Sequence, residues 1–171
     1  WSKIVLVNAL TPPAIEKVCI LTAPIQSGKT TALVKWTEGR NDAYGILTPQ
    51  VKGKRVFMNV QSRQLFLMEA KEGETETLTV GRFIFSKNNF NKAVQVIREG
   101  IDKDGWLIID EVGPLELRGE GFADVLKEVL ARRQRQVIVV VRDKEDMVER
   151  VKEYFGIGEA VIINDINETG K

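Results

Sequence analysis

The chain has 171 residues, of which 43% are apolar and 29% are charged, which is enough for one domain with a buried core. Its 25 basic and 24 acidic residues leave a net charge of +1, so bulk charge does not favour coating nucleic acid or an anionic membrane. The absence of histidine and the single cysteine exclude imidazole bases, histidine metal ligands, internal disulfides and thiolate clusters. Carboxylates, Lys, Arg, hydroxyls, backbone amides and a hard cation remain for chemistry.

The first residues precede the main pattern. We interpret residues 1–16 as an N-terminal extension or edge strand, and residues 17–171 as the domain. The apolar run 4–10 is too short to span a bilayer, and it lacks the full pattern of a signal peptide. We therefore expect a cytoplasmic protein without a membrane partner. The sequence leaves open whether residues precede Trp1.

The first half of the chain alternates short apolar runs with one helical stretch. The expected strands are 17–23, 45–48, 55–60, 64–69 and 78–80. A helix over 28–36 is expected directly after the glycine-containing loop that follows the first strand. Strands 55–60 and 64–69 would form an antiparallel hairpin insertion around residues 61–63.

The second half continues the alternation, which is typical of an α/β fold around a buried parallel sheet. Ser86 is expected to cap a helix that ends near Gly100. The remaining expected strands are 106–109, 137–141 and 160–163. Apolar residues from Phe122 to Leu130 recur at helical spacing, and Asp143 is expected to cap a helix that Gly156 ends.

The sharpest motif is the stretch from Ala23 to Thr30, which fits the Walker A phosphate loop except that Ala23 stands where the stricter pattern has glycine. Such a loop presents converging backbone N–H groups to polyphosphate at a helix N-terminus. Lys29 would contact the β- and γ-phosphates, and Thr30 would offer its hydroxyl to Mg²⁺. The predicted nucleotide-binding residues are Pro24, Ile25, Gln26, Ser27, Gly28, Lys29, Thr30 and Thr31.

A second motif is the apolar strand that ends in Asp110 and Glu111. A carboxylate at the carboxyl end of a parallel strand faces the ligand crevice of a doubly wound sheet. Asp110 would hold Mg²⁺ directly or through water. Glu111 is a candidate base for the attacking water, which favours hydrolysis over transfer to a bound acceptor.

The string Ile109 to Leu117, together with residues 45–48, 54–56 and 81–83, resembles the THEP-type nucleoside-triphosphatase family. The resemblance runs from about Lys17 to the C-terminus. It implies a three-layer, RecA-like P-loop NTPase domain with a mostly parallel central sheet. It also implies Mg²⁺-dependent hydrolysis of nucleoside triphosphates such as ATP and GTP to diphosphate and phosphate, with broad base tolerance.

The resemblance assigns further roles residue by residue. It implies catalytic roles for Lys29, Glu111 and Arg82, metal binding by Thr30 and Asp110, and a base contact by Asn167. Glu116 matches a second acidic position, for which a structural and a functional role are both open. Besides Arg82, Arg118 and Arg142 are candidates for an arginine that reaches the γ-phosphate. Without such an arginine, turnover is expected well under ~1 s⁻¹.

Two other functions fit the same motifs. A P-loop kinase would transfer phosphate to a nucleoside or small acceptor, although no compact arginine-rich lid is visible. A nucleotide-dependent switch would bind tightly and hydrolyse little. The basic cluster of Arg132, Arg133 and Arg135 is interpreted as a favourable helix end rather than a nucleic-acid site, because no aromatic residues are interleaved.

Overall fold

The computed structural model describes residues 17–23, 28–132 and 136–170, so the expected extension 1–16 lies outside the described residues. The strands are β1 (Lys17–Ala23), β2 (Ala43–Leu47), β3 (Gln50–Val51), β4 (Lys54–Asn59), β5 (Leu65–Leu67), β6 (Thr77–Val80), β7 (Phe83–Ser86), β8 (Trp106–Asp110), β9 (Gln136–Arg142) and β10 (Val161–Ile163). The helices are α2 (Lys29–Thr37), α3 (Lys87–Glu99), α4 (Pro114–Leu117), α5 (Ala123–Arg132), α6 (Met147–Phe155) and the 3-10 helix η1 (Ile166–Gly170).

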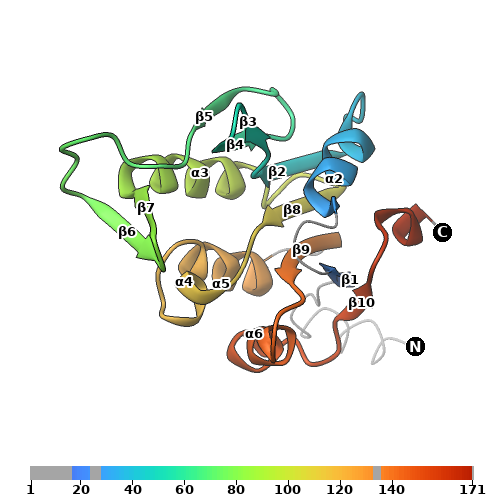
Figure 1. The fold of residues 1–171 in the computed structure, drawn as a ribbon. Helices are drawn as coiled ribbons and strands as arrows, with labels where there is room; N and C mark the ends of the chain where they lie inside the picture. The colour runs from blue at the N-terminus through green and yellow to red at the C-terminus, as the bar shows by residue number, and fades with distance from the viewer. Residues whose placement is uncertain (1–16, 24–27, 133–135, 171) are drawn as a thin grey trace, which may run out of the picture.

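The central sheet has the order β10-β1-β9-β8-β2-β4-β3, with β5 also paired to β4 (Figure 1). Pairings from β10 to β2 are parallel, and those of β4 with β2, β3 and β5 are antiparallel. The expected α/β fold with a mostly parallel sheet and a β4–β5 hairpin is therefore confirmed.

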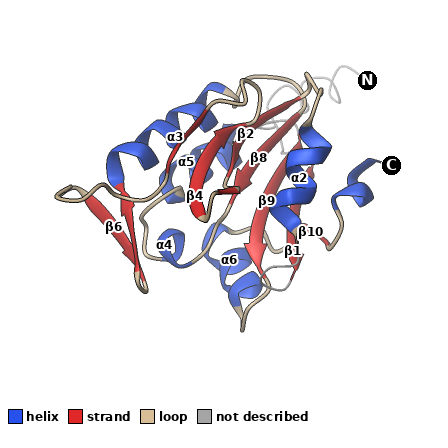
Figure 2. Cartoon of the chain, turned by 45° about the horizontal axis from the view of Figure 1, so that its top comes forward, coloured by secondary structure: helices blue, strands red, loops and turns tan. Residues whose placement is uncertain are grey.

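Alternate residues of the central strands pack on opposite faces, which makes three layers. In β9, Val137, Val139 and Val141 join the core beneath α3, α5 and α6, whereas Ile138 and Val140 join the core beneath α2. Figure 2 shows α2 on one face of the sheet and α3 and α5 on the other. Burial of both faces explains the continuous apolar runs of these strands. No helix in the described ranges is long and apolar enough to cross a bilayer.

Three of the four expected helix-end signals are confirmed, and Gly100 is the C-cap residue of α3. The Ser86 hydroxyl accepts a hydrogen bond from the Asn89 N–H (3.2 Å) and caps α3, and Gly156 ends α6 in the left-handed conformation with φ 66°. The expected cap at Asp143 is wrong. Glu145 has φ 53°, which interrupts helical geometry, so α6 begins at Met147 after Asp146.

A second hairpin, β6–β7, forms a two-stranded sheet of its own. Residues 78–80 were expected as a strand, and their partner Phe83–Ser86 was not. The hairpin stands at one side of the molecule, away from the parallel strands (Figure 1). It is joined to the β5 region because the Ala70 N–H donates to the Ile84 carbonyl (2.9 Å) and the Ser86 N–H to the Met68 carbonyl (2.9 Å).

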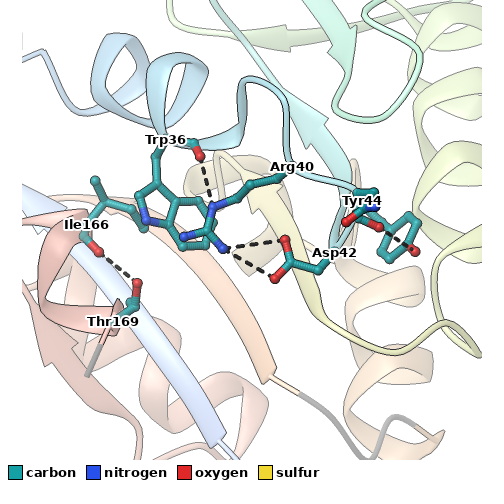
Figure 3. A network of polar contacts seen from close by, with 7 residues as sticks. Trp36, Arg40, Asp42, Tyr44, Ile166 and Thr169 are labelled. Atoms are coloured by element: carbon teal, nitrogen blue, oxygen red, sulfur yellow. Dashed lines mark hydrogen bonds and ion pairs between the residues drawn. The ribbon is translucent and has the colours of Figure 1, made fainter.

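The carboxyl end of α2 is fixed by a local polar cluster (Figure 3). The Arg40 guanidinium lies 3.7 Å from the centroid of the Trp36 ring, its Nε donates to the Trp36 carbonyl (3.0 Å), and it pairs with Asp42 (3.3 Å). In η1, which packs against α2, the Thr169 hydroxyl donates to the Ile166 carbonyl (2.7 Å). The Arg40 contacts tie the carboxyl end of α2 to the loop that leads to β2.

Candidate active site

A cavity of about 540 Å³ opens where α2 begins, beside the carboxyl ends of the parallel strands. Its lining includes residues 28–31 of the α2 start, residues 48–50 after β2, Arg55 of β4, Glu111 after β8 and Arg142 at the end of β9. A wider depression of about 730 Å³ lies between the loop 71–74 and the start of α3, and its lining contains none of the residues predicted to act. The chemistry that the sequence predicts therefore concentrates in the cavity at α2.

The start of α2 has the features of an anion site. Gly28 takes the left-handed conformation with φ 82°, and no side chain of the described residues caps the helix. A Cβ at Gly28 would meet no described atom within 4 Å beyond its chain neighbours, so conformation rather than crowding favours glycine there. The first-turn amides and Lys29 remain beside the cavity. The predicted loop residues Pro24, Ile25, Gln26 and Ser27 lie outside the described residues.

Asp110 joins the two motifs. It is fully buried at the end of β8, and its Oδ2 accepts hydrogen bonds from the Thr30 hydroxyl (3.0 Å) and from the Thr48 N–H (3.2 Å). Thr30 and Asp110 are 80 residues apart in the chain. Burial, and then the neighbouring Glu111 carboxylate, raise the pKa of Asp110 to about 6, although the hydrogen bonds and Lys29 oppose this shift.

Unpartnered polar atoms gather at this edge of the sheet. Among the described residues, the buried side-chain polar atoms without a hydrogen-bond partner are Thr22 Oγ1, Asp110 Oδ1 and Arg142 Nε. They come from the ends of the neighbouring strands β1, β8 and β9. Buried polar groups in native proteins are nearly always paired with protein, water or a ligand. Their concentration here therefore points to a polar ligand or ion.

The donor set beside Asp110 suits a hard cation. The described residues contain no cluster of three or more metal-binding side chains. Mg²⁺ commonly needs only one or two protein oxygens, because water and substrate phosphates complete its coordination. The free Oδ1 of Asp110 and the adjacent Thr30 hydroxyl fit that requirement.

Glu111 and Arg142 form an ion pair at the cavity. The Glu111 Oε1 lies 3.3 Å from the Arg142 Nη2, and the two side chains are 23% and 29% exposed. Both therefore keep contact with solvent while they line the cavity. Within the described residues, Oε1 of Glu111 therefore faces the Arg142 guanidinium.

The comparison with known families settles the class of protein. The profile of the NTPase family matches residues 18–167. The chain belongs to this family. It is thus an NTPase, as the sequence predicted. Two similar relatives are the nucleoside-triphosphatase THEP1 of Methanosarcina barkeri, 26% identical over 84% of this chain and 86% of the relative, and that of Methanothermobacter thermautotrophicus, 29% identical over 75% and 82%.

Solved structures agree with the fold. THEP1 from the hyperthermophile Aquifex aeolicus superposes with a TM-score of 0.68 at 24% identity, covering 89% of this chain and 91% of that one. A human cancer-related nucleoside triphosphatase gives a TM-score of 0.64 at 20% identity, covering 86% and 88%. The three-layer architecture of this NTPase is therefore shared with both.

Three residues predicted for the NTPase site, Arg82, Arg118 and Asn167, lie outside the cavity lining. Arg82 is exposed in the β6–β7 turn, with its guanidinium 5.3 Å from the Phe83 ring. Asn167 is exposed in η1, where its N–H donates to the Asp165 carboxylate (2.9 Å). Arg118 instead donates to the Thr79 carbonyl (2.7 Å). Roles for Arg82 and Asn167 stay predictions.

Arg55 lines the cavity, although its sequence context predicts only a place in a strand. The chain gives no local signal for this position, because the pairing of β4 with β2 is a contact between separate segments. β4 runs antiparallel to β2, so its first residues lie at the edge where β2 ends. Because β4 runs opposite to the parallel strands, its N-terminal residues, rather than its last ones, lie at the site.

Glu116, whose role was open, makes structural contacts. It is buried in α4, where its Oε1 accepts from the Gly113 N–H (2.8 Å) and its Oε2 from the Phe122 N–H (2.9 Å). Burial raises the pKa of Glu116 to about 7 against the effect of these hydrogen bonds. The carboxyl group ties the turn after β8 to the start of α5.

Proposed function

We propose that this protein hydrolyses nucleoside 5′-triphosphates to diphosphate and phosphate with Mg²⁺. The observation that carries the proposal is the set of unpartnered buried polar atoms beside the Thr30–Asp110 hydrogen bond, next to a cavity lined by Lys29 and Glu111. There, a divalent cation would bind the unpartnered carboxylate oxygen, and phosphate oxygens would accept from the unpartnered donors.

In this proposal the start of α2 binds the phosphate chain. The uncapped amides following Gly28 would donate to phosphate oxygens, and the helix dipole favours the negative charge. The Lys29 ammonium would contact the β- and γ-phosphates, and Thr31 lies beside it at the cavity. The residues from Pro24 to Ser27 would complete the loop.

Thr30 and Asp110 would hold the metal. Bound Mg²⁺ would supply positive charge that neutralises the phosphates and orients them for attack. The Thr30 hydroxyl now donates to Asp110 Oδ2 (3.0 Å), so both side chains already face one another. Their mutual hydrogen bond preorganises the pair, which lowers the cost of arranging ligands when the substrate binds.

Glu111 would orient the attacking water and take its proton. Its ion pair with Arg142 (3.3 Å) engages Oε1 and keeps the carboxylate at the cavity wall. The second oxygen would accept a hydrogen bond from water directed at the terminal phosphate. A base at this place favours hydrolysis over phosphoryl transfer to another acceptor.

Broad base tolerance and slow turnover belong to the same proposal. The sequence has no Asn-Lys-x-Asp string of the kind that selects guanine, and the described lining of the cavity lies at its phosphate end. P-loop hydrolases that act without a partner protein turn over far below ~1 s⁻¹, even where an arginine of the same chain contacts the γ-phosphate. We expect similar rates for ATP, GTP, CTP and UTP, each in this slow range.

The test is phosphate release from the four triphosphates with Mg²⁺, with and without excess chelator. We expect release that needs the metal and falls roughly 10²-fold or more in Glu111→Gln. Glu120→Gln, a change at an exposed carboxylate paired with Arg118, is the matched control. Parent-like hydrolysis by Glu111→Gln would refute the water-activating role. A phosphorylated nucleoside product would indicate a kinase, and tight binding without release would indicate a switch.

A further inference from the structure

Three cationic side chains line the cavity, and they differ in what balances their charge. They are Lys29, Arg55 and Arg142. Arg142 is paired with the Glu111 carboxylate (3.3 Å). Within the described ranges, the Arg55 guanidinium has no ion pair and no side-chain hydrogen bond, and its contact is the face of an aromatic ring. Arg55 is therefore a cation at the cavity whose charge the described protein does not neutralise.

Main-chain contacts fix the place of Arg55. It is the second residue of β4, opposite Gln50 of β3, which also lines the cavity. Its N–H donates to Glu69 Oε2 (3.3 Å), and its carbonyl accepts from the Met68 N–H (3.2 Å). Strand pairing on both sides of β4 thus presents the side chain at the carboxyl edge of the parallel sheet.

Phe83 holds the Arg55 head group without cancelling its charge. The Arg55 guanidinium carbon lies 5.2 Å from the centroid of the Phe83 ring. An aromatic face attracts a cation but carries no net charge, so the guanidinium keeps its capacity for an anion. Phe83 itself stacks on Phe85, with centroids 5.9 Å apart and planes inclined by 4°. The β6–β7 hairpin therefore positions an arginine that belongs to the central sheet.

We propose that Arg55 binds the terminal phosphate of the bound triphosphate and that Phe83 is its positioning residue; this inference rests on the proposed function. The guanidinium N–H groups would donate to oxygens of the γ-phosphate, and no covalent bond to Arg55 forms. Lys29 and the proposed Mg²⁺ together do not balance the whole charge of a fully ionised triphosphate, and Arg142 is engaged with Glu111. Arg55 supplies positive charge where charge develops during hydrolysis.

Binding measurements separate this role from general binding. We would measure Mg²⁺-dependent affinities for ADP and for a non-hydrolysable ATP analogue in the parent and in Arg55→Gln. The analogue should bind roughly 10- to 100-fold more weakly to the variant, since a charge-assisted hydrogen bond is lost, and ADP should be little affected. The kcat should fall roughly 10²-fold or more. Arg55→Lys should recover part of both losses, since it keeps the charge without the planar fork.

The neighbouring Lys54 provides the charge control. It is exposed on the same strand and does not line the cavity, so Lys54→Gln should keep parent-like affinities and kcat. Phe83→Leu should lose affinity for the ATP analogue but not for ADP, and the loss should be smaller than that of Arg55→Gln. Its melting temperature would establish that the variant is folded.

Three results would overturn the inference. Equal losses of ADP and analogue affinity in Arg55→Gln would mean that Arg55 contacts a group that both ligands carry, rather than the γ-phosphate. A triphosphate-selective loss in Arg82→Gln but not in Arg55→Gln would assign the role to Arg82, whose guanidinium shares the Phe83 ring. Unchanged analogue affinity and kcat in Arg55→Gln would exclude the role altogether. If the parent releases no phosphate, the proposed hydrolysis fails, and the ADP and analogue comparison still decides the role of Arg55.

Discussion

Asp110 and Glu116 are two buried carboxylic acids on the same segment, and they differ in how their oxygens are satisfied. Burial raises the pKa of both, to about 6 for Asp110 and about 7 for Glu116. Both oxygens of Glu116 accept main-chain hydrogen bonds, whereas Asp110 Oδ1 has no partner among the described residues. Unmet hydrogen-bonding capacity, rather than burial or a shifted pKa, therefore separates the proposed metal ligand from the carboxyl group that holds the chain together.

The largest expected effect is on turnover by Asp110→Asn. Removing the charge should weaken Mg²⁺ binding and lower kcat by roughly 10²- to 10³-fold. The free energy of unfolding should change by no more than about 1 kcal/mol, because the amide oxygen can still accept from Thr30 and Thr48. Steady-state phosphate release and urea denaturation measure the two quantities. A large loss of stability with normal turnover would mean that Asp110, like Glu116, has a structural role.

Glu116→Ala should show the opposite pattern. It leaves the N–H groups of Gly113 and Phe122 buried without an acceptor, which costs about 2–4 kcal/mol of unfolding free energy. Nucleotide affinity of the folded fraction should stay close to that of the parent, because Glu116 does not line the cavity. Urea denaturation and calorimetric binding at a temperature where the variant is folded would test this. A selective loss of nucleotide affinity would contradict a structural role.

The raised pKa of Glu116 predicts a pH dependence of stability. Between pH 4.5 and 7, folded Glu116 keeps a proton that the unfolded chain has released. The free energy of unfolding should therefore fall as pH rises through this window, by up to about 3 kcal/mol from this group. Denaturation curves of the parent and Glu116→Gln, measured from pH 4 to 8, isolate its share as their difference. A constant difference across the window would mean that the group is not shifted.

A pair of glycine substitutions gives the smallest effects and the sharpest contrast. Gly121, with φ 60°, faces Glu116, and a Cβ there would collide with its carboxylate, so Gly121→Ala should lower stability by about 2 kcal/mol. Gly28 has a similar φ of 82°, but no described atom beyond its chain neighbours lies within 4 Å of a Cβ there, so Gly28→Ala should cost about 1 kcal/mol. Gly28→Ala should weaken nucleotide binding, and Gly121→Ala should not. Calorimetric titration with nucleotide would measure binding to both variants. Weaker binding by Gly121→Ala together with parent-like binding by Gly28→Ala would contradict the placement of the site at the start of α2.

Local signals predicted much of the fold. The apolar runs of β1, β8 and β9 identify strands because both of their faces are buried. Ser86 and Gly156 identify helix ends because capping depends on a few neighbouring atoms. The capping pattern is wrong at Asp143, because Glu145 takes a left-handed conformation and α6 begins only at Met147. An aspartate before a helical pattern does not reveal the backbone conformation of the residues between them.

By itself, the sequence determined the class of protein and the pairing of its two motifs. Spacing and residue type predicted that Thr30 and Asp110 serve one site, because parallel strands bring their carboxyl ends to a single edge. Only the tertiary structure decided which other groups reach that edge. Arg55 lines the cavity because an antiparallel strand reverses direction, and Phe83 meets it from a separate hairpin. Such contacts depend on how distant segments pack, and no local pattern in the chain encodes that geometry.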